Sequence, residues 1–282
     1  MSNRDPNPAL ADRVALEVHN LTATYQRKPV LWDIDFHLPE GQIIGMLVPN
    51  GSGKTTLLRN ILGLMKPDCG YVRILGSSLD QVRGQVSYVP QREAVDWNFP
   101  VSVQEVVEMG RYRPGRLLRR LSRQDREWGK QAMEKTGLLP LARRHISQLS
   151  GGQQQRVFIA RAIAQQADIY LMDEPFVGVD AATEEAILAL LQEMKNQGKT
   201  VIMVHHDLQT ARDYFDHIVL LQTRLIAAGP AKEVLTAENL QQAYGGKLNV
   251  LAQMSELVAQ ERFPMRERAF EEKKAPRDGS DS

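Results

Sequence analysis

The stretch that most constrains the fold runs from residue 49 to residue 56, with the sequence Pro-Asn-Gly-Ser-Gly-Lys-Thr-Thr. An apolar segment, Ile43–Leu47, precedes it, and a run of helical character, Leu57–Leu62, follows it. Strand, glycine-rich loop and helix is the order that a phosphate-binding loop requires, because glycines and a helix N-terminus turn backbone N–H groups toward an anion. We therefore predict a nucleoside triphosphate site.

The side chains of this phosphate loop (residues 49–56) have distinct expected tasks. Lys54 offers a point charge to the β- and γ-phosphates, and the Thr55 hydroxyl is expected to bind Mg²⁺, because a hard cation prefers oxygen ligands. The alternative is a glycine-rich turn with an incidental lysine. The predicted nucleotide-binding residues of the loop are Asn50, Gly51, Ser52, Gly53, Lys54, Thr55 and Thr56.

One position departs from the usual loop pattern, G-x-x-x-x-G-K-[ST]. Counting back from Gly53, the first glycine falls at position 48, where this chain has Val48. Where that glycine serves a positive φ or a close backbone approach, a β-branched residue costs about 1–3 kcal/mol of strain. With strain at this position, we expect nucleotide binding to survive and hydrolysis to slow.

Composition limits the class of protein. The chain has 282 residues, of which 43% are hydrophobic, enough for one large domain or two lobes. The net charge of +1 creates no field that would attract nucleic acid. No apolar run is long enough for a transmembrane helix and the N-terminus lacks a signal sequence, so a cytosolic protein is expected. Cys69, the only cysteine, rules out an internal disulfide and is expected in a turn.

The segment before the phosphate loop predicts an antiparallel β region. Apolar and polar residues alternate from Val14 to Tyr25 and from Val30 to Leu38. Tyr25 either packs within its strand or stacks on an adenine ring. The expected inward-facing residues of the second strand are Leu31, Ile34, Phe36 and Leu38.

After the loop helix, strands are predicted over residues 71–76 and 86–91. Gln91 ends the second of these strands, where its side chain can point toward a metal ion and an attacking water. Ser102 and Glu105 predict a capped helix start. The arginine-rich segment 111–126 is interpreted as a solvated helical face or as a contact for lipid headgroups or an acidic loop. Trp97 and Phe99 are interpreted as a surface anchor, with a buried hinge as the alternative.

A second anion site is predicted at residues 149–153, Leu-Ser-Gly-Gly-Gln, which we call the signature segment. Ser150 and two glycines, Gly151 and Gly152, open an apolar helix there. The segment can be a simple helix cap, but glycines at a helix start lower its stability, which favours close approach of a ligand.

A third cluster of polar residues follows the predicted strand at 167–172. Asp173 and Glu174 come directly after it, where open α/β sheets bind their ligands. Side-chain alternation separates the two carboxylates, so Asp173 is expected to hold Mg²⁺ and Glu174 to face the attacking water. Two charged residues that merely end a strand in solvent are the alternative.

The remaining segments complete the predicted sheet. An amphipathic helix is expected over residues 180–195, a buried strand over 200–204 and two short strands over 216–229. A histidine at the end of the buried strand can bond a γ-phosphate. The adjacent pair His205 and His206 is a poor zinc site, because neighbours on a strand point in opposite directions.

Five motifs stand in one order along the chain: the phosphate loop, Gln91, the signature segment, residues 169–175 and His206. Over residues 14–230, this order resembles that of the ATP-binding subunit of ABC transporters. The resemblance implies a RecA-like α/β core, an antiparallel β subdomain and an inserted helical subdomain. It implies an ATP-binding domain over residues 14–245, with helices at about 92–165. The polar composition of residues 1–13 predicts a flexible arm, residues 246–263 are expected to form a helical extension, and the charged composition of residues 264–282 predicts a disordered tail.

The resemblance also assigns roles. Two copies close head to tail, so that each ATP lies between Lys54 of one copy and Ser150 of the other. Tyr25 resembles the adenine-stacking aromatic and Gln91 the lid glutamine. The catalytic carboxylate corresponds to Glu174, the dimer-contact aspartate to Asp180 and the switch histidine to His206, while Gly151, Gly152 and Gln153 belong to the second half of the ATP site.

Residues 92–100, 176–180 and 204–207 are similar to the branch that imports manganese, zinc or iron. This similarity implies a homodimeric ATPase at the cytoplasmic face of the cell membrane, acting with integral membrane permease subunits and an external substrate-binding protein. The alternatives are a soluble ABC-type clamp, an importer ATPase for another solute such as an iron chelate, and a regulatory module with little hydrolysis.

Overall fold

The computed structural model describes residues 13–25, 28–49, 51–112 and 121–245. Asn50, most of the predicted N-terminal arm, the arginines between 113 and 120, the extension at 246–263 and the tail at 264–282 lie outside the described residues.

The antiparallel β region predicted before the phosphate loop forms two strands of a three-stranded antiparallel sheet, whose third strand comes from beyond the loop helix. Its strands, in the order β2-β1-β4, are β1 (Val14–Tyr25), β2 (Lys28–Pro39) and β4 (Cys69–Ile74). Glu17 pairs with His37 on β2 and with Arg73 on β4. The four residues predicted to face inward on β2 are buried. Cys69 was expected in a turn, which is wrong: it is exposed and begins β4, where it pairs with Thr22.

A six-stranded sheet forms the centre of the molecule, in the order β5-β6-β7-β3-β8-β9. Neighbouring strands are parallel except for the last pair, β8 and β9. The parallel strands are short and apolar, and every residue of β3, β6 and β7 is buried, as expected for strands covered on both faces. The strand bounds are β3 (Ile43–Leu47), β5 (Val86–Val89), β6 (Ile169–Asp173), β7 (Thr200–His205), β8 (His217–Gln222) and β9 (Arg224–Pro230).

Side-chain alternation along these strands divides the interior into two cores. Ile44 and Met46 of β3 pack on the side of the three-stranded sheet, whereas Ile43 and Leu47 face the opposite side. Helix α2 (Lys54–Ile61) belongs to the first core, because Leu57, Leu58 and Ile61 are buried there. The phosphate loop therefore connects a central strand to a helix held between two sheets.

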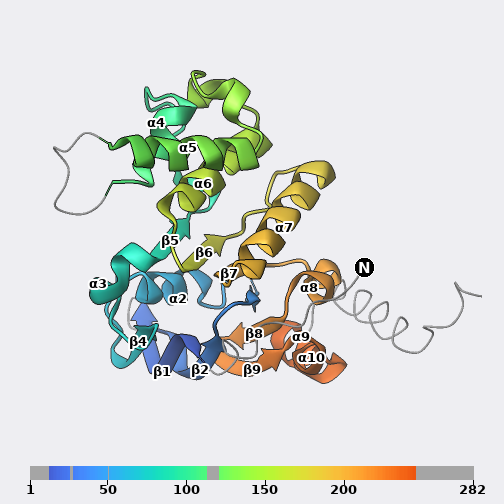
Figure 1. Ribbon diagram of the computed structural model, residues 1–282. Helices are drawn as coiled ribbons and strands as arrows, with labels where there is room; N and C mark the ends of the chain where they lie inside the picture. Colours follow the sequence, from blue (N-terminus) through green and yellow to red (C-terminus); the bar gives the residue numbers. More distant parts are fainter. Residues whose placement is uncertain (1–12, 26–27, 50, 113–120, 246–282) are drawn as a thin grey trace, which may run out of the picture.

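The helices α4 (Val103–Met109), α5 (Arg123–Lys135) and α6 (Gly151–Gln165) lie together at one end of the molecule, away from the three-stranded sheet (Figure 1). Each begins with a serine in a capping box: Ser102, Ser122 and Ser150. The other α-helices among the described residues are α3 (Leu79–Val82), α7 (Ala181–Asn196), α8 (Leu208–Tyr214), α9 (Ala231–Val234) and α10 (Ala237–Tyr244).

Two side chains are partly buried where the sequence suggested surface. Arg111, expected on a solvated face, pairs with Asp125 at 2.9 Å and donates to the carbonyl oxygens of Ala164 and Gln165 at the end of α6. Trp97 is no surface anchor, because its ring packs edge-on against Phe158 at 5.2 Å. Arg111 and Trp97 thus each connect the segment that contains them to α6.

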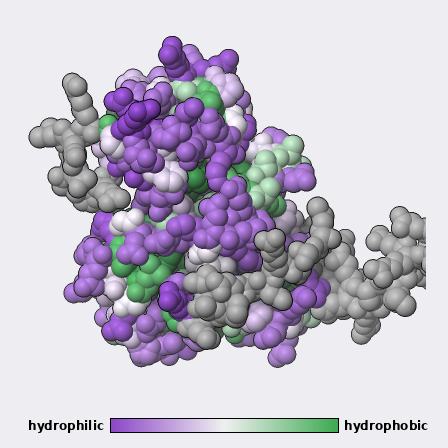
Figure 2. All heavy atoms as spheres, in the orientation of Figure 1, coloured by the Kyte–Doolittle hydropathy of each residue, from purple (hydrophilic) through white to green (hydrophobic). Residues whose placement is uncertain are grey.

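The face in Figure 2 is mainly hydrophilic, with smaller hydrophobic areas. In the described ranges, none of the helices combines the length and apolar character needed to cross a bilayer.

Candidate functional site

The phosphate loop depends on glycine at two positions. Gly51 and Gly53 have φ angles of 84° and 100°, in the left-handed region. A Cβ on Gly53 would also lie 2.6 Å from Leu31 Cδ2 and 2.9 Å from the Val30 carbonyl oxygen. Because Gly53 is the N-cap of α2 and provides no side-chain cap, the first N–H groups of the helix are left for an anion.

Val48 does not carry the strain expected of it. Six non-glycine residues in the described part of the chain have positive φ, and Val48 is not among them. Its side chain is 3% exposed and packs in the core between the two sheets. The expectation of left-handed strain at this position is therefore wrong.

Three elements bring Lys54, Gln91 and Glu174 together. The Lys54 ammonium at the start of α2 contacts Glu174 Oε1, and the Gln91 amide nitrogen donates to Glu174 Oε2 at 3.2 Å. Glu174 follows β6 directly and has a φ of 49°, a strained conformation that holds its carboxylate in the site. An arriving triphosphate would compete with Glu174 for Lys54.

Asp173 and Glu174 occupy separate environments. Asp173 ends β6, is 7% exposed, and its Oδ1 atom has no hydrogen-bond partner among the described residues. Burial raises the pKa of Asp173, while the charge of Lys54 opposes this effect and that of Glu174 adds to it. A buried carboxylate oxygen without a partner fits a hard cation such as Mg²⁺.

The other side chains expected to bind Mg²⁺ through oxygen atoms are those of Thr55 and Gln91. Thr55 is exposed at the start of α2, and the Gln91 side-chain oxygen takes no part in the bond to Glu174. A cluster of three or more histidine, cysteine, aspartate or glutamate side chains suited to a metal ion does not occur among the described residues. Most remaining ligands would thus be phosphate and water oxygens.

The adjacent histidines after β7 differ in environment. His205 is 4% exposed, lies against Phe176, Tyr214 and Phe215, and its Nε2 atom is 2.9 Å from Thr210 Oγ1. Burial lowers its pKa to about 4, so the ring is neutral at physiological pH. His206 is exposed, as required of a histidine that would reach a phosphate.

The signature segment forms a capped helix start. The Ser150 hydroxyl accepts from the Gln153 N–H, and the Gln153 side chain accepts from the Ser150 N–H at 3.0 Å. Asp180 caps α7 by accepting from Thr183, whose backbone hydrogen bond lowers the pKa of Asp180. In the described part of the chain, no hydrogen bond or ion pair joins Ser150 to Lys54. Within the described residues of one copy, the two predicted anion sites are thus not joined by a hydrogen bond or an ion pair.

Tyr25 ends β1 with 57% of its surface exposed, which leaves its ring open to a ligand. The sequence placed Arg92, which follows Gln91 directly, only within the segment 92–100 that resembles the metal-importing branch, and gave it no part in the ATP site. Its Nε atom donates to the side-chain oxygen of the buried Gln154 at 3.0 Å, and its guanidinium lies beside Gly151. Only the folded arrangement reveals this neighbour of the signature segment.

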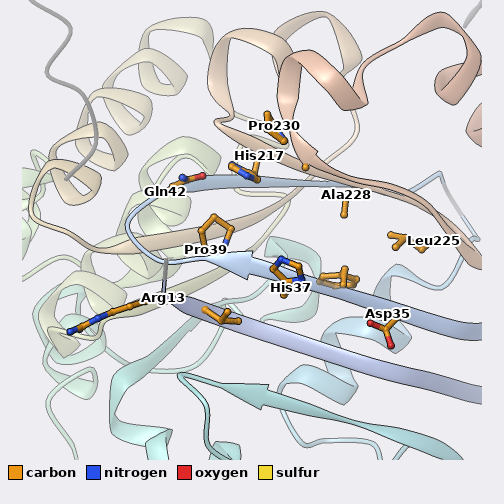
Figure 3. Close-up of a pocket in the computed structure, with 12 residues that line it drawn as sticks. Arg13, Asp35, His37, Pro39, Gln42, His217, Leu225, Ala228 and Pro230 are labelled. Atoms are coloured by element: carbon orange, nitrogen blue, oxygen red, sulfur yellow. The ribbon is translucent and has the colours of Figure 1, made fainter. Parts of the chain in front are cut away.

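The cavity in Figure 3 is separate from these residues. It has a volume of about 800 Å³ and lies between β2 and β9, with His37 on one side and Gln42 and His217 nearby (Figure 3). Gln42 precedes β3 and His217 begins β8, so the cavity lies at the amino ends of these strands. The phosphate loop follows the carboxyl end of β3, at the opposite edge of the sheet.

This combination of fold and site agrees with the comparisons to known proteins. The family model described as ABC transporter matches residues 31–177, and the chain belongs to this family. Its α/β fold has the RecA-like core, the antiparallel sheet and the helical region expected from the sequence, and it is an ATP-binding and ATP-hydrolysing protein of the ABC class.

Individual relatives are similar over most of their length. The manganese transport system ATP-binding protein MntB of Bacillus subtilis (strain 168) is 56% identical over 236 residues, which cover 84% of this chain and 94% of that protein. The zinc transport system ATP-binding protein TroB of Treponema pallidum (strain Nichols) is 49% identical over 239 residues, 85% of this chain and 90% of that one. A solved structure described as an inward-facing conformation of a putative metal-chelate type ABC transporter has a TM-score of 0.73 and 31% identity, covering 82% of this chain and 89% of that one.

Proposed function

We propose that this chain hydrolyses ATP to power an importer of manganese or of another divalent transition metal, such as zinc or iron. The names and high identities of the manganese and zinc transport relatives support this assignment. The observation that carries the ATPase half of the proposal is the convergence of Lys54 and Gln91 on Glu174.

In this proposal, the loop residues from Asn50 to Thr56 bind the phosphates of ATP, and the exposed ring of Tyr25 stacks on the adenine. Thr55, Gln91 and Asp173 would hold Mg²⁺, which neutralises phosphate charge when bound. As the triphosphate draws Lys54 away, Glu174 is released to orient the attacking water and accept its proton. Gln91 positions that water, and His206 bonds the γ-phosphate.

The second half of each site comes from another copy of the chain. Ser150, Gly151, Gly152 and Gln153 of that copy would face the terminal phosphate, and its Asp180 would contact the loop across the dimer. The absence of a hydrogen bond or ion pair between Ser150 and Lys54 among the described residues of one copy is consistent with this arrangement. Closure on two ATP molecules and reopening after hydrolysis would then drive transport.

The transport partners follow from the same proposal. The homodimer binds integral membrane permease subunits at the cytoplasmic face of the membrane, and an external substrate-binding protein delivers the metal. Residues 92–100, where Phe99 is 55% exposed, form the proposed contact with the permease.

Uptake of radiolabelled manganese, zinc and iron by cells that lack this subunit tests the proposal. Uptake of a divalent metal should fall, and the wild-type chain but not Glu174→Gln should restore it. Co-purification of an integral membrane protein should accompany the activity. Unchanged uptake of all three metals, together with sedimentation on ribosomes, would instead support the soluble clamp.

A further inference from the structure

Arg92 is fastened against the start of α6. Its Nε atom donates to Gln154 Oε1 at 3.0 Å, and Gln154 is only 5% exposed and donates in turn to the Ile146 carbonyl oxygen. The Arg92 carbonyl oxygen accepts from Trp97 Nε1 at 3.0 Å. Side chain and backbone of Arg92 are thus held from two directions.

This anchoring places the guanidinium beside two glycines. A Cβ on Gly151 would lie 3.2 Å from Arg92 Cζ, and a Cβ on Gly178 would lie 3.9 Å from Nη1. Gly151 is the first residue of α6, and Gly178 belongs to the turn that leads to Asp180. The guanidinium therefore lies where the signature segment approaches the start of α7.

The electrostatics of this position are unfavourable for one copy alone. The N-terminus of a helix carries partial positive charge, so a cation beside it is repelled. Among the ion pairs of the described residues, none includes Arg92, and Nε is its only side-chain donor with a described acceptor. The Nη groups of a guanidinium have the fork geometry that matches phosphate.

We propose that Arg92 binds the terminal phosphate of the ATP held by the phosphate loop of a second copy. This role rests on the proposed function, because it requires the signature segment of one copy to meet the loop of another. It adds a cation, attached to the Gln91 segment of one copy, to the ATP site of its partner. Loss of the cation should weaken ATP-driven closure and leave binding to the loop intact.

The test uses the full chain with Glu174→Gln, which should block hydrolysis and trap the closed dimer. Light scattering during an ATP titration gives the concentration that half-dimerises the protein. Adding Arg92→Gln should raise this concentration about tenfold or more, since a charge-assisted bond is removed. Arg92→Lys should restore part of the loss, because lysine keeps the charge but lacks the fork, and the exposed Arg83→Gln is the matched control.

Binding of ADP to the monomer should be the same in all variants, because ADP lacks the terminal phosphate. An unchanged ATP requirement in Arg92→Gln would overturn the proposal. So would equal defects in Arg92→Gln and Arg92→Lys, which would indicate that Arg92 only supports Gln154. If the Glu174→Gln parent itself fails to dimerise with ATP, the two-copy site fails as well, which separates that result from a failure at Arg92.

Discussion

Val48 replaces the first glycine of the phosphate-loop pattern without entering a left-handed conformation. The loop instead places its positive φ angles at Gly51 and Gly53. A valine at position 48 extends the buried apolar run of β3 into the core between the sheets. The departure from the motif is thus a packing feature.

Replacing Val48 with glycine should therefore destabilise the protein and leave its chemistry unchanged. Loss of a buried valine side chain and the added freedom of glycine together predict a loss of about 2–4 kcal/mol in the free energy of unfolding. Denaturant unfolding measures this loss, and Val14→Gly, at a position 39% exposed, is the control. Faster ATP hydrolysis per folded molecule in Val48→Gly would contradict this interpretation.

His205 makes stability depend on pH in a defined window. Its pKa is about 4 in the folded protein, against 6.5 for the free side chain, so between these values the unfolded chain binds more protons. The contribution of the neutral ring is complete above pH 6.5, falls as the pH falls, and levels off near pH 4.

The variant His205→Phe should lose less stability on acidification than the wild-type protein. At pH 5 the difference between the two losses, each taken relative to pH 7, should be about 2 kcal/mol. Urea unfolding at both pH values measures it, with the exposed His37→Gln as the control. Parallel pH profiles for wild type and His205→Phe would show that the buried ring is not responsible.

At the scale of elements, the contact between α4 and α6 leaves no room for a side chain. Gly110 ends α4, and a Cβ there would lie 2.2 Å from the carbonyl oxygen of Arg161 in α6. Backbone atoms cannot move aside as a flexible side chain can, so the two helices would have to separate.

We expect Gly110→Ala to destabilise the helical region by about 1–3 kcal/mol, the usual effect of overpacking. Hydrogen exchange of α4 and α6 amides should accelerate, while nucleotide affinity of the monomer stays unchanged. Gly84→Ala is the matched control, because a Cβ at Gly84 meets nothing within 4 Å. Equal exchange in both variants would mean that the helices adjust without cost.

Local sequence patterns correctly predicted the position of a side chain where that position depends only on the strand or loop that contains it. Alternation along β2 predicted the buried face, and the order of strand, glycines and lysine predicted the phosphate loop. Patterns failed where a partner came from elsewhere in the chain. Arg111 is partly buried because it bonds the end of α6, and Arg92 is partly buried because its guanidinium bonds Gln154. Neither contact has a signal in the spacing of arginines.

At the scale of the whole molecule, the helical region is joined to the central sheet by one continuous core. Val106 of α4 and Leu149 before α6 belong to the same buried cluster as Leu47 and Val201 of the sheet. Displacement of α6 would therefore be transmitted to the strands that carry the phosphate loop, and a phosphate at the start of α6 could control both.

The two-copy arrangement predicts that two inactive variants restore each other. Lys54→Ala removes the loop cation, and Ser150→Asp keeps a good N-cap residue while adding a charge that repels phosphate. In a mixed dimer, the intact loop of one copy meets the intact signature segment of the other. At equal mixing half of the dimers are mixed and each has one intact site, so ATPase activity should return to about a quarter of the wild-type value.

The control for this experiment combines Lys54→Ala with Glu174→Gln. Because Lys54 and Glu174 meet within one copy, both changes damage the same half of the site, and every dimer in that mixture has two defective sites. No activity should return. No recovery in the mixture with Ser150→Asp would place the signature segment and the loop of each ATP site in one and the same chain. Recovery in this control would instead mean that Lys54 and Glu174 of one site act from different copies.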